Sequence, residues 1–254
     1  PIHLLLQNPK MTTEMMTTMV EAWPESVKEM TSVLKDQYGN QTGGGELPIH
    51  LLLQNPKMTT EMMTTMVEAW PESVKEKTSG RVLPIHFLLQ NPNVTTEMMT
   101  TMVKAWPESV KEKTKDGKLP IHLALESKKS LSRNNQGQRV DEESKVAEIS
   151  EETLTQVTKL LVEAWPESAK EQMPGGELPL HLLLQNPNVT TEMVTTLVEA
   201  WPESVKERTT VLKYNGGRQA GGGELPIHLL LQNPKMTTEM VTTMVEAWPE
   251  SVKE

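Results

Sequence analysis

Six histidines recur in nearly the same apolar surroundings, and histidine is the side chain best suited to metal binding and to proton transfer near neutral pH. A zinc ion needs all its donors at about 2 Å, whereas neighbouring packed helices lie about 8 to 10 Å apart. Each histidine also lacks a second His, Cys or close carboxylate in its own segment, such as "PIHLLLQNP". We therefore expect no metal site, and interpret them as structural side chains bonded to the backbone. They are His3, His50, His86, His122, His181 and His228.

A catalytic role for these histidines is equally disfavoured, because an active site is ordinarily one place on a molecule and not six equivalent places. The chain has no Gly-rich phosphate loop after a strand and no G-x-S-x-G segment. The segment "GGGELP", at 43–48 and 221–226, lacks the Lys-Ser/Thr of a phosphate loop and is better explained as a flexible connection. We expect no catalytic residues, no cofactor and no enzyme activity.

A tryptophan follows each histidine, and the pair defines an internal repeat. The distance from His to Trp is 20 residues in five cases and 43 in the fourth. The shortest complete repeat is 36 residues long, which lies within the range typical of stacked repeat proteins. One Trp at the end of a helix is more often a core residue than part of a ligand-stacking ladder. The tryptophans are Trp23, Trp70, Trp106, Trp165, Trp201 and Trp248.

These spacings predict one array of six repeats with no separate domain. Repeat four has a polar insertion at about 127–150, which we expect to be mobile, and repeat six is truncated. The predicted boundaries of the repeats are 1–46, 47–82, 83–118, 119–177, 178–224 and 225–254.

The sequence of each repeat predicts two helices followed by a polar connection. "LPIHLLLQN" begins a short helix with Pro at its first position and ends it at Asn-Pro. In "TTEMMTTMVEAWP", Thr12 is a predicted cap and Pro24 stops the second helix. The polar stretch that follows contains Asp116-Gly117, a strong signal for a hairpin turn.

Neither helix can bury its apolar side alone, so we expect the repeats to stack into an all-α solenoid with one continuous core. The 17 methionines, at helical spacing and with only one Phe in the chain, indicate a soft core.

The segment Leu119-Pro120-Ile121-His122-Leu123-Ala124 resembles the T-P-L-H-x-A signature of ankyrin repeats, and "KTKDGK" before it resembles their hairpin. The resemblance covers essentially the whole chain. Three departures are a Leu in place of the Thr, a period three residues longer, and "EAWPESVKE" in place of the Gly that closes the second helix. The lost Thr removes a cap and a hydroxyl partner for the histidine. The resemblance implies two helices per repeat and a partner-binding surface made of the hairpin tips and the exposed side of the first helices.

Comparison between repeats places the variation in the connections. The segments 1–29 and 48–76 are identical, so these helices cannot present different side chains to a partner. Tyr and Arg are frequent interface anchors, and both tyrosines lie in the long connections. The predicted partner-binding residues are Tyr38, Arg81, Lys115, Asp116, Lys118, Tyr214 and Arg218. The alternative is that these are simply solvated polar loops.

The bulk composition excludes several classes of partner. A net charge of −9 without a basic stripe argues against nucleic acid, and the longest aliphatic run, three leucines, against a membrane span. The absence of Cys favours a reducing compartment inside a cell, although no residue names the compartment.

We therefore expect a non-catalytic scaffold that binds a protein partner of unknown identity. The alternative is a structural spacer array with no partner of its own within a larger multidomain protein. Because repeat one lacks the leucine before Pro1 and repeat six ends without its hairpin, we also expect apolar end faces and weak end-to-end self-association.

Overall fold

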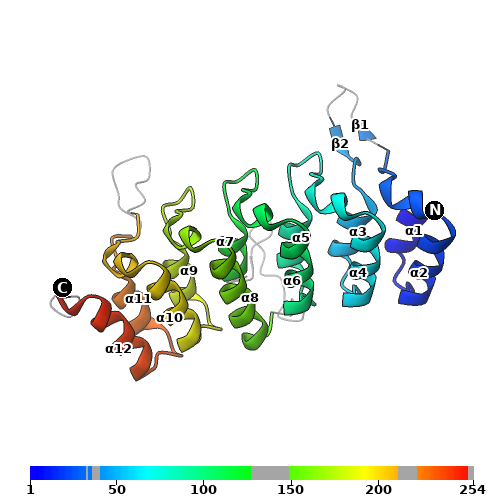
Figure 1. Cartoon of the computed structure of the whole chain (residues 1–254). Helices are drawn as coiled ribbons and strands as arrows, with labels where there is room; N and C mark the ends of the chain where they lie inside the picture. The colour runs from blue at the N-terminus through cyan, green and yellow to red at the C-terminus, as the bar shows by residue number, and fades with distance from the viewer. Residues whose placement is uncertain (33, 36–40, 127–148, 211–221, 251–254) are drawn as a thin grey trace, which may run out of the picture. The chain divides into compact units, whose positions relative to one another are not determined.

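The computed structural model describes residues 1–32, 34–35, 41–126, 149–210 and 222–250, and Figure 1 shows their course. They form two compact parts, Pro1–Lys115 and Asp116–Glu254, named here the N-terminal and the C-terminal part. The boundary falls in the connection between predicted repeats three and four. Regular structure in the described residues is helical apart from one short hairpin, which confirms the predicted all-α class.

The N-terminal part contains three pairs of α-helices, each followed by a 3₁₀-helix. The first helices are short, at five to seven residues, and the second helices have ten. The elements are α1 (Ile2–Leu6), α2 (Thr13–Ala22), η1 (Pro24–Lys28), β1 (Leu34–Lys35), β2 (Gln41–Gly43), α3 (Pro48–Gln54), α4 (Thr60–Ala69), η2 (Pro71–Lys75), α5 (Pro84–Gln90), α6 (Thr96–Ala105) and η3 (Pro107–Lys111).

The C-terminal part repeats the order of two α-helices followed by a 3₁₀-helix, and its last described element is α12. Its helix α8 is one turn longer than the other second helices, at 14 residues, because Ser150 caps it earlier in the chain. The elements are α7 (Pro120–Leu125), α8 (Glu151–Ala164), η4 (Pro166–Lys170), α9 (Pro179–Gln185), α10 (Thr191–Ala200), η5 (Pro202–Lys206), α11 (Pro226–Gln232) and α12 (Thr238–Ala247).

Within each part the helices form two layers with the core between them. In the N-terminal part α3 packs between α1 and α5, and α4 packs between α2 and α6. In the C-terminal part α9 packs between α7 and α11, and α10 between α8 and α12. Leucines of the first helices, such as Leu52, and methionines of the second, such as Met63, are fully buried between the layers.

The helices begin where the sequence predicts, for local reasons. Pro48 stands at the first position of α3, where its missing N–H costs no hydrogen bond. The Thr12 hydroxyl accepts from the Met15 N–H at 3.2 Å and caps α2. Helix α2 ends because Trp23 adopts φ −148° and ψ 78°, outside the helical region, just before Pro24.

The tryptophans are not core residues, which corrects the expectation from the sequence. Trp23 is 42% exposed, and Trp70, Trp106, Trp165, Trp201 and Trp248 are half-buried. Each described Trp directly follows the last residue of its second helix and has non-helical backbone angles. Its side chain therefore does not continue the apolar stripe of that helix.

The segment "PESVK", or "PESAK" at 166–170, that follows each of the first five tryptophans is also not the polar loop predicted from the sequence. It forms a 3₁₀-helix in which the Ser and the apolar residue after it are buried, as Ser73 and Val74 are at 1% and 0% exposure. Proline opens this turn just as it opens the first helices. The core position assigned to Trp is thus taken four residues later by Val27, Val74, Val110, Ala169 and Val205.

The connections close as hairpins. β1 and β2 pair antiparallel, and below them the Thr31 N–H bonds the Glu46 carbonyl at 2.9 Å. The same closure joins Thr78 to Val82 in the next connection, at 3.0 Å. Figure 1 shows these hairpins beyond the ends of the helices in the N-terminal part.

Candidate binding surface

Each well-buried histidine is bonded to the backbone at both ring nitrogens. The Leu47 N–H donates to Nδ1 of His50 at 3.0 Å, and Nε2 lies 2.9 Å from the carbonyl of Glu76. Because Nδ1 accepts, the ring proton sits on Nε2 and is donated to that carbonyl. The same pair of bonds is made by His86, His122 and His181.

This geometry serves a first helix whose N-cap residue, Leu47, offers no side-chain hydrogen bond of its own. The imidazole accepts a hydrogen bond from the backbone N–H at the start of its own helix and so partly caps that helix. Its other nitrogen bonds the carbonyl of the residue just after the 3₁₀-helix, which lies 26 positions later for His50, His86 and His181 and 49 positions later for His122. Burial lowers the pKa of His50, His86 and His181, while the hydrogen bond to the Glu carbonyl opposes the shift. The rings of these three histidines are therefore neutral, and their hydrogen bonds join the start of one helix to the end of a 3₁₀-helix.

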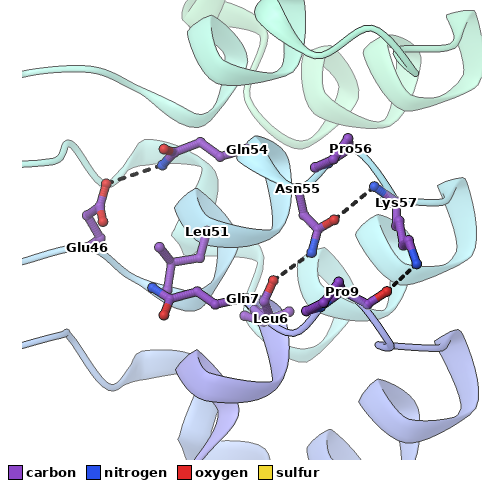
Figure 2. Close-up of a pocket in the computed structure, with 9 residues that line it drawn as sticks. All are labelled: Leu6, Gln7, Pro9, Glu46, Leu51, Gln54, Asn55, Pro56 and Lys57. Atoms are coloured by element: carbon purple, nitrogen blue, oxygen red, sulfur yellow. Dashed lines mark hydrogen bonds between the residues drawn. The ribbon is translucent and has the colours of Figure 1, made fainter.

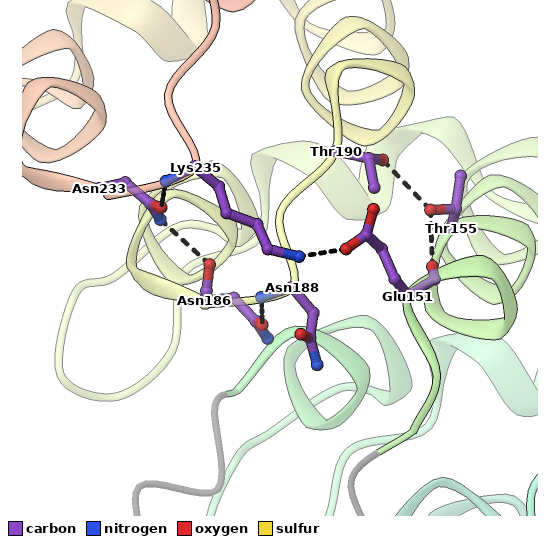
Figure 3. A network of polar contacts seen from close by, with 7 residues as sticks. All are labelled: Glu151, Thr155, Asn186, Asn188, Thr190, Asn233 and Lys235. Carbon is purple, nitrogen blue, oxygen red and sulfur yellow. Dashed lines mark hydrogen bonds and ion pairs between the residues drawn. The ribbon is translucent and has the colours of Figure 1, made fainter.

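Asparagines supply contacts between repeats that the sequence analysis missed. Asn55 Nδ2 donates to the Leu6 carbonyl at 2.6 Å, and Asn91 Nδ2 donates to the Leu53 carbonyl at 2.7 Å. In the C-terminal part Asn233 bonds the carbonyls of Leu184 and Asn186 at 2.8 and 3.0 Å, and Figure 3 shows the second bond. Each acceptor is a carbonyl at or just beyond the end of the preceding first helix, where intrahelical donors run out. The recurrence of "QNP" in the sequence is the signal for these contacts, although by itself it predicts only the end of a helix.

A second line of contacts runs between the starts of successive second helices. The hydroxyls of Thr13 and Thr59 are 3.3 Å apart, and those of Thr155 and Thr190 are 3.1 Å apart. Figure 3 places the second pair beside the ion pair of Lys235 with Glu151, which joins α8 to the turn before α12. Successive repeats within each part are thus tied at the ends of both helices.

A groove lies between repeats one and two, where the ends of α1 and α3 meet the base of the hairpin (Figure 2). Its volume is about 450 Å³. Leu6 and Leu51 supply apolar wall, and the Glu46 carboxylate accepts from the Gln54 amide at 3.2 Å. The other lining residues are Gln7, Pro9, Asn55, Pro56 and Lys57. The groove lies at the base of the hairpin and beside the ends of the first helices α1 and α3.

Arg81 is the predicted partner residue with the most unusual backbone. It is exposed, with φ +60°, and is the only non-glycine of positive φ among the described residues. It stands three residues before Pro84. The corresponding residue of every other connection is a glycine of positive φ, namely Gly45, Gly117, Gly176 and Gly223.

The other predicted partner residues are not brought together by the structure. Lys115 is an exposed residue of the N-terminal part, whereas Asp116 and Lys118 belong to the C-terminal part. Lys118 is engaged within its own repeat, because its ammonium lies 2.6 Å from the Glu126 carboxylate. Tyr38, Tyr214, Arg218 and the insertion from 127 to 148 lie outside the described residues.

Neither a protein-family model nor a curated protein matches this sequence. In the described part of the chain, no three His, Asp or Glu side chains gather closely enough to hold a metal ion. No described helix has the length and apolar character needed to span a membrane. The fold and the surface therefore define the chain as an all-α protein whose described histidines serve its own packing.

Proposed function

We propose that the chain is an ankyrin-like helical solenoid and a non-catalytic scaffold. It binds a protein partner through the hairpins and the exposed side of the first helices. Support for the solenoid comes from the two-layer packing within each part and from the Asn and Thr contacts that tie one repeat to the next. The histidine bonds give each repeat the same internal frame without the Thr of the ankyrin signature.

The single observation that carries the binding role is the backbone of Arg81. A left-handed conformation costs a non-glycine residue roughly 1 to 2 kcal/mol, and four sister positions avoid this cost with glycine. Strained residues of this kind gather at ligand clamps and switch regions. An exposed arginine at such a position is best explained by an interaction of its side chain.

The chemistry of the surface indicates the kind of partner segment. Arg81 makes no ion pair with any described residue, and a guanidinium suits a carboxylate through two parallel hydrogen bonds. The groove adds side-chain amides from Gln7 and Gln54 beside apolar wall. We therefore propose a peptide segment of the partner that carries an acidic side chain.

Arg81→Gly separates binding from folding because the two effects have opposite signs. We expect the free energy of unfolding of the variant to rise by about 1 kcal/mol, because glycine relieves the backbone strain. The variant should therefore unfold at a higher denaturant concentration. Capture of a saturable protein partner from a lysate should fall at the same time. Arg81→Lys keeps the charge but not the paired hydrogen bonds and should bind with intermediate strength.

The control is Lys28→Ala on η1, which removes an exposed cation whose one ion-pair partner among the described residues is Glu25 of its own turn. Partner capture should be unchanged in this variant. Equal capture by the wild-type chain and by Arg81→Gly would overturn the proposed binding surface. Failure to recover any saturable partner would instead favour the spacer array. The near-identity of the helices is also compatible with a spacer, because identical helices present the same side chains.

A further inference from the structure

The groove between repeats one and two carries a negative charge that the described residues leave without an ion pair. The Glu46 carboxylate lines the groove and accepts a hydrogen bond from the neutral Gln54 amide at 3.2 Å. No cation in the described part of the chain pairs with this carboxylate. Lys57 is the one cation among the lining residues, and its ammonium donates to the Pro9 carbonyl instead. Figure 2 shows Lys57 well apart from Glu46, towards the other end of the groove.

The equivalent pair of side chains in repeat four shows that an ammonium can pair with a carboxylate at this position. Lys118 there is the copy of Glu46. Glu126 is the copy of Gln54, and the Lys118 ammonium lies 2.6 Å from its carboxylate. Repeat two thus has a carboxylate and a neutral amide where repeat four has a complete ion pair. The missing cation can be supplied by a ligand.

The walls of the groove suit the aliphatic part of a lysine side chain. Leu6 and Leu51 are buried residues that line it, and Pro9 and Pro56 line it as well. A lysine side chain lays its methylene groups along apolar surface and keeps its ammonium at a polar end. The volume of about 450 Å³ lies within the range of roughly 300 to 1,000 Å³ that is typical of ligand sites.

The carboxylate in the groove favours lysine over arginine. A guanidinium binds a carboxylate best through two parallel hydrogen bonds, one to each oxygen. One oxygen of Glu46 already accepts from Gln54, so an arginine would have to share it. An ammonium is a compact charge with three donors. It can bond the other Glu46 oxygen and the side-chain oxygens of Gln7 and Gln54, which accept no hydrogen bond from a described residue.

We propose that the groove is a pocket for a lysine side chain of the partner segment, with Glu46 as its anionic anchor. The inference rests on the proposed binding function and deepens it, because the segment then carries a lysine as well as an acidic residue. The connections that hold Glu46 and Arg81 lie side by side, since the Ser79 hydroxyl of the second is 3.5 Å from the Gly44 carbonyl of the first. One segment can therefore reach both charges.

Titration of the full 254-residue chain with the blocked peptide acetyl-Gly-Lys-Gly-amide tests the proposal. Binding is followed by NMR through the side-chain amide signals of Gln7 and Gln54. The peptide has no acidic group, so Arg81 takes no part in its binding and Arg81→Gly should give the same titration. Failure of the lysine pocket is thus distinguished from failure of the proposed function, which depends on Arg81.

We expect the lysine peptide to shift these signals saturably. The same peptide with norleucine in place of lysine should bind at least roughly tenfold more weakly, because it lacks the charged hydrogen-bond donor. Glu46→Gln should weaken binding of the lysine peptide by a similar factor, although glutamine keeps the shape and can still accept from Gln54. The control is Glu224→Gln, which removes the same charge from repeat six, where Gln232 donates to Glu224 at 3.2 Å. This control should leave the titration unchanged.

Three results would overturn the proposal. Equal binding of the lysine and norleucine peptides would mean that the groove recognises apolar surface alone. Undiminished binding of the lysine peptide to Glu46→Gln would exclude the carboxylate as the anchor. A wild-type chain whose signals show no saturable shift would exclude the pocket, and the role of Arg81 would then still be decided by partner capture.

Discussion

The imidazole of His50 holds two backbone groups that would otherwise lack partners, and this explains why one side chain recurs in the same place. Its Nδ1 accepts the N–H of Leu47, and its Nε2–H reaches the end of the 3₁₀-helix at Glu76. Both bonds require the neutral ring with its proton on Nε2. Protonation would convert the accepting nitrogen into a second donor that faces an N–H group.

We predict that stability falls as the pH is lowered below 6.5. The ordinary pKa of 6.5 applies to the unfolded chain, and burial lowers the pKa of His50, His86 and His181 in the folded chain. The unfolded state therefore binds more protons, and the stabilisation present above pH 6.5 is lost as the pH falls through the lowered values. Each unit of pKa difference contributes about 1.4 kcal/mol.

Urea unfolding of the wild type and of His50→Gln on both sides of pH 6.5 measures this effect. The variant should be less stable near neutral pH but should lose less stability on acidification. A wild-type free energy of unfolding that stays constant or rises below pH 6.5 would contradict the assignment of neutral rings.

The serine of each described 3₁₀-helix offers a substitution of opposite sign. The hydroxyl of Ser73 is buried without a hydrogen-bond partner among the described residues. Ser73→Ala removes a desolvated polar group with little change in volume, and we expect a gain of about 1 kcal/mol in the free energy of unfolding. In the matched variant Thr59→Ala, loss of the cap on α4 should cost about 1 kcal/mol. Destabilisation by Ser73→Ala would show that its hydroxyl has a partner.

At the scale of the element, the junction between neighbouring first helices depends on one amide. Asn91 Nδ2 bonds the carbonyls of both Leu53 and Asn55, and its Oδ1 accepts the Asn93 N–H at 2.9 Å. One buried side chain thus fixes the turn of its own repeat and the end of the preceding helix. The contact between α3 and α5 cannot shift without breaking these bonds.

Asn91→Ala should therefore lower the free energy of unfolding by roughly 2 to 3 kcal/mol, because it leaves buried carbonyls without donors. The cost should appear as faster amide hydrogen exchange in α3 and α5. Asn93→Ala is the control, because Asn93 is exposed and the Pro56 carbonyl is the one partner of its side chain in the described part of the chain. Equal stability of the two variants would contradict a stabilising role for the hydrogen bonds of Asn91.

The boundaries of the helices were predictable from the sequence, and several contacts were not. Pro48 and Thr12 act through their own backbone neighbours, so local sequence was enough to place the helix starts. Ser73 is buried because its 3₁₀-helix packs against other helices. The sequence "PESVK" has one aliphatic residue and therefore no hydrophobic period from which this packing could be predicted. The exposure of the tryptophans and the Asn contacts likewise depend on how one repeat meets the next.

At the scale of the whole molecule, stability should grow from contacts between neighbours within each part. Within each part, neighbouring first helices pack on one another, and so do neighbouring second helices. Such a molecule has no single nucleus on which all other contacts depend. Its free energy of unfolding should be close to a sum over repeats and junctions.

Deletion of residues 47–82 tests this central claim most directly, because it removes repeat two and still leaves "GGGE" followed by Leu83-Pro84. Asn91 would then meet the Leu6 carbonyl through the same contact that Asn55 makes. By circular dichroism and urea unfolding, we predict unchanged helix content per residue, cooperative unfolding and a smaller free energy of unfolding. Loss of helix throughout the shortened chain would contradict a fold built from neighbour contacts.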